Sequence, residues 1–186
     1  LQFWGKTPRV GEAAERFHPA IYHMLDVAFV AEALLRDGSP RLRRVLLHAW
    51  QGCDSDPLIA WLPFLIATHD LGKISAAFQG QVESQRDRLT AQGVVCSIHG
   101  AEPLYHAEIS AVWLHTELKT HAPGIARRLL WTLRDAMGGH HGRFSQHQMS
   151  DIEAKLARNE RSEPRWKQWR VAAYQLLHEY LAPPGN

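Results

Sequence analysis

The 186-residue chain has few cysteines, no apolar run of membrane-spanning length and almost no net charge. Its two cysteines, Cys53 and Cys96, form no Cys-x-x-Cys pair, which excludes a disulfide scaffold and a zinc site built on cysteine and favours a reducing cytoplasm. The most apolar stretches, 27–35 and 58–71, are too short for a membrane span or contain His and Asp. The N-terminus has no signal-peptide pattern, so no membrane contact is expected. A formal charge of +2 leaves nucleic acid open, because binding depends on local clusters of Lys and Arg.

Strand-like alternation of apolar and polar residues is also absent from the sequence. Apolar residues recur at helical spacing instead, and the length suits one domain with one core. We therefore expect an all-α fold, a compact helical bundle, with helices over 20–36, 41–50, 56–72, 73–82, 102–118, 123–137, 146–160 and 163–181. Residues 83–100 are predicted to be a flexible loop, and residues 138–142 a tight glycine-rich turn.

Histidine, by contrast, is abundant, with twelve in the chain. Neutral imidazole is the commonest ligand of transition metals. The pair His69-Asp70, followed by Gly72 and Lys73, is the most informative site of all. Adjacent imidazole and carboxylate groups can bind one divalent metal or bridge two, and Lys73 at i+3 shares a helical face with Asp70. This pattern indicates a site that handles phosphate.

Further candidate ligands lie on separate predicted helices and at the glycine-rich turn: His23, His106, His140 and His141. They are too far apart in the sequence to form a metal site within one short segment, so folding must assemble the site, as in the cores of helical bundles. A shared carboxylate, Asp70, could hold two cations roughly 3.5–4 Å apart, which suits phosphoester hydrolysis. Imidazole-rich ligation favours one or two ions of Mn, Fe, Co, Ni, Cu or Zn, with Mg less favoured.

Each signal also has a simpler interpretation. Taken singly, His23 could be a core or surface histidine, a His-Asp pair arises often by chance, and His140-His141 could form a solvated turn. Asp26, one turn after His23, could orient an imidazole or be a surface carboxylate. The histidines without a partner pattern are predicted to be surface or loop residues: His18, His48, His99, His115, His121, His147 and His178.

Basic residues near the double-histidine turn could track a phosphate backbone toward the metals or line a solvated helix face. These are Arg127, Arg128, Arg134 and Arg143. Residues 165–170 interleave cations with tryptophans, as a surface that stacks single-stranded bases would. Because Trp166 and Trp169 are spaced i, i+3, however, we favour a core position for both.

Five segments in this order carry a resemblance to one known family: 3–6 (Phe-Trp-Gly-Lys), 22–28 (Tyr-His-Met-Leu-Asp-Val-Ala), 69–73 (His-Asp-Leu-Gly-Lys) followed by Phe78-Gln79, 105–107 (Tyr-His-Ala) and 139–142 (Gly-His-His-Gly). Together they resemble the HD-superfamily nuclease domain of the CRISPR-associated helicase-nuclease of type I systems, with subtype I-E expected. The resemblance extends from about residue 3 to residue 144.

The resemblance implies a bundle of the HD superfamily with two metals in its core. His23, His69 and Asp70 would hold one ion, and a second group would hold the other, with Asp70 as the bridge: Asp70, His106, His140 and His141. It also implies that Lys73 lies near the scissile phosphate and stabilises the charge that builds there. Residues 1–186 would be a single nuclease domain, the N-terminal fragment of a longer helicase-nuclease, and Leu1 in place of an initiator methionine fits that expectation.

The implied activity is metal-dependent hydrolysis of single-stranded DNA, as an endonuclease or exonuclease, in CRISPR interference against foreign DNA. The implied partners are the helicase portion of the same protein and a guide-RNA surveillance complex. The family also supplies a downstream aspartate to the first metal, in a pattern like Ala-Asp-Trp-x-Gly-Ser, which this sequence lacks before Asn186. We therefore expect the first metal to bind more weakly. Two alternatives stay open: an HD phosphohydrolase acting on nucleotides or cyclic dinucleotides, and a metal-binding helical docking domain without turnover.

Overall fold

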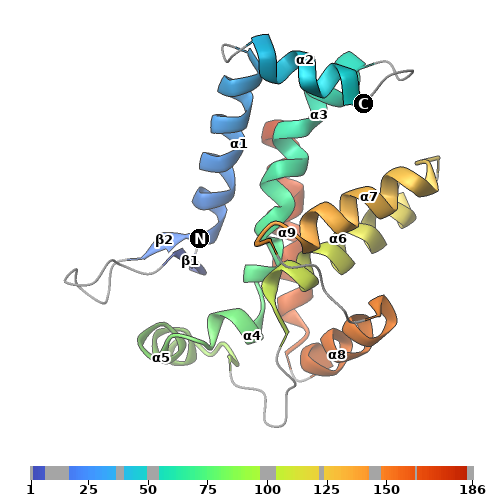
Figure 1. The fold of residues 1–186 in the computed structure, drawn as a ribbon. Helices are drawn as coiled ribbons and strands as arrows, with labels where there is room; N and C mark the ends of the chain where they lie inside the picture. Colours follow the sequence, from blue (N-terminus) through green and yellow to red (C-terminus); the bar gives the residue numbers. More distant parts are fainter. Residues whose placement is uncertain are drawn as a thin grey trace.

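The elements of the chain are almost all helical, as Figure 1 shows. The computed structural model describes residues 2–6, 17–36, 40–49, 55–96, 104–121, 124–142, 148–161 and 163–183. Its elements are β1 (Trp4–Lys6), β2 (His18–Pro19), α1 (Ala20–Arg36), α2 (Pro40–Ala49), α3 (Ser55–Ala67), the 3₁₀ helix η1 (Thr68–Lys73), α4 (Ala76–Gln79), α5 (Glu83–Ala91), α6 (His106–His121), α7 (Arg127–Gly138), α8 (Met149–Arg161) and α9 (Arg165–Leu181). The all-α prediction is confirmed. Within these residues, none of the helices is both long and apolar enough to cross a membrane.

The helix predicted over 56–72 changes character near its end. It is α-helical through Ala67 and then tightens into the 3₁₀ helix η1. Two side chains bond to carbonyl groups at this change: Thr68 Oγ1 donates to Leu65 O at 2.7 Å, and His69 Nδ1 lies 2.7 Å from Ile66 O. Such bonds back to the third preceding residue compete with regular helical bonding. His69 and Asp70 both lie in this tighter helix, most of whose residues are buried.

The predicted flexible loop at 83–100 is wrong, because α5 occupies its first half. Gln85 and Leu89, four residues apart, form a narrow buried face on an otherwise polar helix, and Leu89 is completely buried. So few apolar positions give little periodicity in the sequence. After α5 the chain turns at Gly93, whose φ of +75° favours glycine, and residues 97–100 lie outside the described part.

Two short strands, β1 and β2, pair antiparallel beside the start of α1. With three and two residues they are too short to show any alternation in the sequence. Gly5 allows β1 to approach closely, because a Cβ there would lie 2.7 Å from Ala20 Cα. This sheet holds the N-terminal residues against the helical core.

The core surrounds η1, which packs against α1, α3, α4, α6 and α9. Its completely or almost completely buried residues include Met24 of α1, Phe64 of α3, Leu71 of η1, Leu114 of α6 and Trp166 of α9. The core position predicted for Trp166 is confirmed, and Trp169 packs partly buried against the same cluster. The element that carries the His-Asp pair is therefore enclosed by other helices on several sides.

Candidate metal centre

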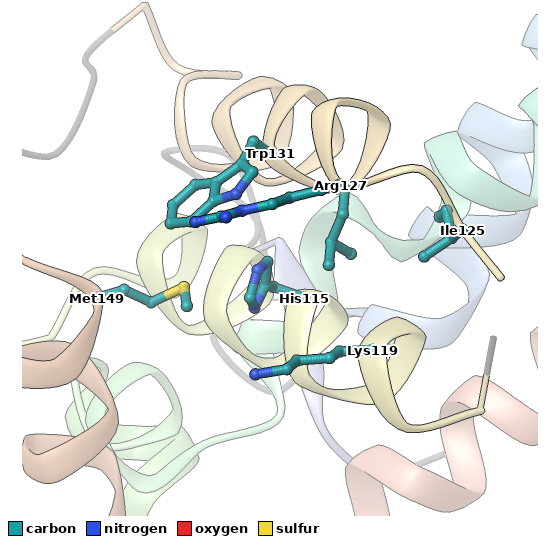
Figure 2. Close-up of a pocket in the computed structure, with 7 residues that line it drawn as sticks. His115, Lys119, Ile125, Arg127, Trp131 and Met149 are labelled. Carbon is teal, nitrogen blue, oxygen red and sulfur yellow. The ribbon is translucent and has the colours of Figure 1, made fainter. Parts of the chain in front are cut away.

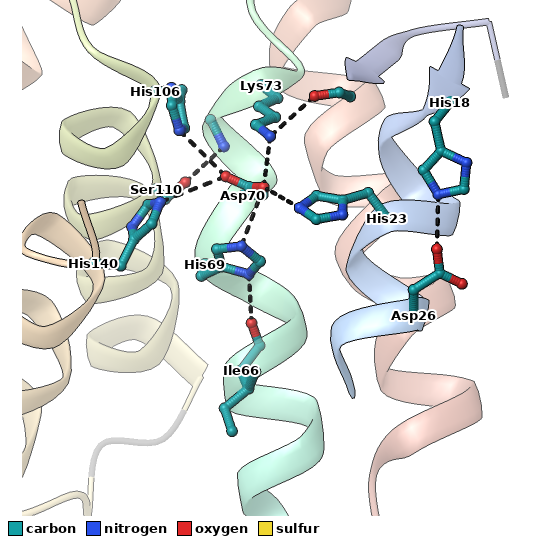
Figure 3. Close-up of polar contacts among 12 residues, drawn as sticks. His18, His23, Asp26, Ile66, His69, Asp70, Lys73, His106, Ser110 and His140 are labelled. Carbon is teal, nitrogen blue, oxygen red and sulfur yellow. Dashed lines mark hydrogen bonds and ion pairs between the residues drawn. The ribbon is translucent and has the colours of Figure 1, made fainter. Parts of the chain in front are cut away.

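The Asp70 carboxylate lies at the centre of a cluster of histidines, and its residue is 1% exposed. Oδ2 contacts His23 Nε2 and His69 Nε2, each at 3.1 Å. Oδ1 faces His106 Nε2 at 3.3 Å and His140 Nε2 at 3.6 Å (Figure 3). The imidazoles come from α1, η1, α6 and the turn after α7, so segments more than a hundred residues apart meet at one carboxylate.

The ligand atoms form two groups that share Asp70. One group comprises His23, His69 and Asp70, and the other comprises Asp70, His106, His140 and His141; within each group the atoms lie within 4.8 Å of one another. His106 Nε2 and His141 Nε2 are only 2.8 Å apart. The structure thus brings together all six residues singled out as candidate ligands, in the grouping that the resemblance implied.

The tautomers of two histidines suit a metal. His69 Nδ1 lies 2.7 Å from Ile66 O, and His140 Nδ1 lies 2.6 Å from Met137 O. Because a carbonyl oxygen can only accept, Nδ1 carries the hydrogen in both rings, and in the neutral form Nε2 offers its lone pair toward Asp70. A hydrogen bond from the ring nitrogen that does not bind the metal, here Nδ1, is what orients metal-binding imidazoles in proteins.

Two buried atoms in the cluster, Asp70 Oδ1 and His140 Nε2, make no hydrogen bond within the described part of the chain. A lone pair of an imidazole and a carboxylate oxygen repel each other unless a cation or proton lies between them. The donor set, with one carboxylate and several imidazoles, is typical of divalent transition metals. The residues present therefore fit a bound divalent cation.

The electrostatics keep Asp70 and His141 in their metal-binding forms, whereas the contacts of His140 with Asp70 and Met137 O raise the pKa of that ring against the effect of burial. Burial raises the pKa of Asp70, but the imidazoles of His106, His140, His23 and His69 around the carboxylate outweigh it, so the net pKa is well below the ordinary value. Burial, with the neighbouring charges of His140 and His106, lowers the pKa of His141. An ionised carboxylate and a neutral imidazole are the species that bind metals.

Gly72 lets α6 approach the His-Asp pair. A Cβ on Gly72 would lie 1.9 Å from His106 O, and the backbone N–H of Gly72 donates to Ser110 Oγ at 2.8 Å. His106, at the start of α6, is thereby held next to Asp70 (Figure 3). Sequence reasoning did not single out Ser110, although it is a small residue one turn after His106 and so on the same face.

Lys73 is buried and donates to Asp70 Oδ2 at 2.8 Å and to Gly5 O at 3.0 Å. Its ammonium also lies 5.5 Å from the centre of the Phe78 ring. A positive charge is thus fixed beside the shared carboxylate, and the same contacts tie strand β1 to the cluster.

Comparison with known proteins identifies the family. The family model described as "Cas3, HD domain" matches residues 4–184. The chain belongs to the Cas3 HD domain family. It is 32% identical over 185 residues to the CRISPR-associated endonuclease/helicase Cas3 of Thermus thermophilus, covering 99% of this chain and 19% of that protein. The chain therefore spans about a fifth of the length of this relative.

Solved structures of similar fold agree. The Thermus thermophilus Cas3 HD domain, crystallised in the presence of Ni²⁺, superposes with a TM-score of 0.62 at 28% identity, covering all of this chain and 67% of that one. A chain described as "CRISPR RNA-guided surveillance complex, pre-nicking" has a TM-score of 0.74 at 26% identity, covering 100% of this chain and 21% of its own length. The predicted resemblance to the CRISPR-associated HD family is confirmed, but its expected end near residue 144 is wrong, because the family match extends to residue 184.

Some predicted residues lie apart from the cluster of this Cas3 HD chain. Asp26 Oδ2 contacts His18 Nε2 at 2.8 Å and not a histidine of the cluster, and its side chain is 63% exposed. Asp26 is therefore the surface carboxylate of the simpler interpretation. The surface position predicted for His115 is wrong. This residue of α6 is buried, with its ring next to that of Trp131 of α7. His178 packs against the rings of Trp61 and Phe64.

The predicted basic residues have mixed surroundings. Arg127 and Arg128 are exposed at the start of α7. Arg134 lies over the Trp131 ring, 4.1 Å from its centre, and pairs with Asp135. Arg143, like His99 and His147, lies outside the described residues.

Proposed function

We propose that this chain is a metal-dependent nuclease domain that hydrolyses phosphodiester bonds of single-stranded DNA. One observation carries the proposal: the buried carboxylate of Asp70 is shared by two groups of histidines that could each hold a cation. The name of the Thermus relative, endonuclease/helicase, and the crystallisation of the related HD domain in the presence of Ni²⁺ support it.

His23, His69 and Asp70 would hold one cation, and a second would be held by Asp70, His106, His140 and His141. Mn, Fe, Co, Ni and Zn suit this imidazole-rich set better than Mg. When bound, a pair of such cations activates water for attack on phosphorus and stabilises the oxygen that leaves.

The protein residues supply charge and position. Asp70 stays ionised because the pKa of its carboxyl is lowered by the surrounding histidines, against the effect of burial. Lys73, held rigidly between Asp70 and Gly5, places a positive charge where a phosphate at the cluster gathers negative charge. Fixed charges of this kind stabilise the transition state without having to reorganise.

We further propose that residues 1–186 form the nuclease part of a longer helicase-nuclease. The curated relative is about five times longer, and one structural match belongs to a surveillance complex. In the cytoplasm, the helicase portion would deliver a single strand of foreign DNA selected by the guide-RNA complex. Arg127, Arg128, Arg134 and Arg143 would contact its phosphates.

The test is cleavage of end-labelled single-stranded DNA by the purified chain, with each divalent metal in turn and with EDTA. Asp70→Ala should abolish cleavage because both groups lose their common ligand. Asp87→Ala, which removes an exposed carboxylate of α5, is the matched control and should cleave normally. Circular dichroism shows whether both variants are folded.

The same assay separates the alternatives. Turnover of mononucleotides or cyclic dinucleotides without DNA cleavage would identify a phosphohydrolase and overturn the proposal. Metal binding without turnover of any substrate would identify a docking domain.

A further inference from the structure

A cavity of about 430 Å³ lies between α6, α7 and the start of α8 (Figure 2). None of the residues that line it belongs to the candidate metal centre. It is lined by His115, Lys119, Ile125, Arg127, Leu130, Trp131 and Met149. Trp131 precedes the end of α7 at Gly138 by seven residues, which corresponds to roughly 10 Å along the helix at 1.5 Å per residue, and His140 lies in the turn beyond that end. The cavity is therefore a separate site on the helix pair that carries part of the candidate metal centre.

Helical spacing explains how the lining converges. His115 and Lys119 are four residues apart on α6, and Arg127 and Trp131 are four residues apart on α7, so each pair shares one face. The two faces look toward each other in Figure 2. The cavity thus combines the aromatic ring of Trp131 and several apolar side chains with the exposed cations Lys119 and Arg127.

The balance of charge around the cavity is positive. Lys119 and Arg127 are exposed at its rim, and the guanidinium of Arg134 lies over the Trp131 ring. Of the acidic groups on these helices, Asp135 pairs with Arg134, Glu117 pairs with His121, and Glu153 lies 3.4 Å from Thr116 Oγ1.

His115 is the buried polar group of the cavity, 6% exposed and with its ring centre 5.4 Å from that of Trp131. Burial and the charges of Arg134 and Lys119 lower its pKa, whereas Glu153 opposes them. A neutral imidazole offers one donor and one acceptor, as the edge of a nucleobase requires.

We propose that this cavity binds one unpaired nucleotide of a single DNA strand, with the base against Trp131 and the phosphates at Lys119 and Arg127. Flat aromatic surfaces combined with cations are how proteins hold single strands without reading their sequence. An acidic peptide would pair with the cations but would gain little from stacking on Trp131. The inference rests on the proposed function, for which the cavity would hold the strand at a distance from the cut.

The test is binding of fluorescein-labelled oligothymidylate to the chain in EDTA, where no cleavage occurs. Trp131→Leu should weaken binding about ten-fold, and Trp131→Phe, which keeps an aromatic face, should restore most of it. Lys119→Ala and Arg127→Ala should each weaken binding and reduce the slope of log K against log salt by about 0.7. Lys167→Ala and Arg44→Ala, exposed cations on α9 and α2, are matched controls and should bind as the unaltered chain does.

Three outcomes would contradict parts of this scheme in distinguishable ways. If the chain cleaves DNA with metal but Trp131→Leu binds oligothymidylate normally, this inference fails and the nuclease proposal stands. If the unaltered chain neither binds nor cleaves DNA, both proposals fail. If Trp131→Leu weakens only the binding of a glutamate-rich peptide, the cavity belongs to an acidic protein partner and the inference is overturned.

Discussion

The side-chain amide of Gln79 hydrogen-bonds to both backbone groups of Trp4, 75 residues away in the sequence. Its Oε1 accepts from the N–H of Trp4 at 3.1 Å, and its Nε2 donates to Trp4 O at 2.8 Å and to Lys73 O at 2.9 Å. Gln79 is completely buried. One amide thus joins strand β1 to the end of η1, next to the lysine that contacts Asp70.

Gln79→Ala should lower the free energy of unfolding by about 3 kcal/mol, because it removes three hydrogen bonds and leaves their buried backbone partners unsatisfied. Urea denaturation measures the change. Gln168→Ala, an exposed glutamine of α9, is the matched control and should change stability by less than about 0.5 kcal/mol. Equal denaturation midpoints for the two variants would show that the amide does not hold β1 in place.

Gly72→Ala should disturb the candidate metal centre, because the added Cβ would lie 1.9 Å from His106 O and must push α6 away. We expect both a lower melting temperature and weaker binding of Ni²⁺. Gly124→Ala has nothing within 4 Å of its added Cβ and should change neither. Calorimetry of the two variants checks the prediction, and Ni²⁺ affinity unaffected by Gly72→Ala would contradict it.

Arg170→Ala should destabilise the fold by about 3–5 kcal/mol, because it leaves a partly buried carboxylate without its cation. Arg170 is completely buried, donates to Ile74 O at 2.7 Å and pairs with Glu160 of α8. Thermal unfolding followed by circular dichroism measures the loss. The exposed Lys167 on the same helix provides the control, and a similar melting temperature for Lys167→Ala and Arg170→Ala would refute the role assigned to the buried pair.

The two candidate metal groups should differ in affinity. Among the described residues one group has three candidate ligands, His23, His69 and Asp70, whereas the other has four. Calorimetric titration with Mn²⁺ or Ni²⁺ should show one tighter and one weaker site. His141→Ala should weaken the tighter site and His23→Ala the weaker one. Two sites of equal affinity would contradict this prediction.

Cys96 should react slowly with iodoacetamide at pH 8, because burial raises the pKa of its thiol to about 11 against the opposing charges of Arg88 and Arg86. A Cys53→Ala variant leaves it as the single thiol. In the unfolded chain the thiol ionises near its ordinary pKa of 9.0, so stability should decline as the pH rises from about 9 to about 11. Labelling in urea gives the fully reactive reference, and equal rates in the folded and unfolded chain would disprove the shift.

Long elements with a strong pattern were predictable from the sequence. Helix α1 covers Ala20–Arg36 as expected, because its apolar face is wide and Gly38-Ser39-Pro40 follows it. Helix α5 was missed because Gln85 and Leu89 alone form its buried face. The β1 and β2 pair was missed because both strands are too short to show alternation and because β1 is also held by Gln79, 75 residues away in the sequence.

The candidate metal centre was also predictable only in part. The type and order of the residues are enough to single out His69, Asp70 and the other histidines of the cluster. The surroundings of single residues were harder to predict: His115 is buried where a surface position was expected, and Asp26 contacts His18. A histidine on a helix does not reveal its neighbours, because the residues that enclose it belong to other helices.

The type and spacing of residues along the sequence determined the helices with wide apolar faces, the metal-binding character of the histidines and the family. Tertiary packing alone decided which atoms meet: which carboxylate oxygen faces which imidazole, which glycine must lack a side chain, and that a glutamine and an arginine are enclosed in the core. These contacts join segments tens of residues apart. Their energies depend on burial and distance, which are properties of the folded chain and not of any short stretch of sequence.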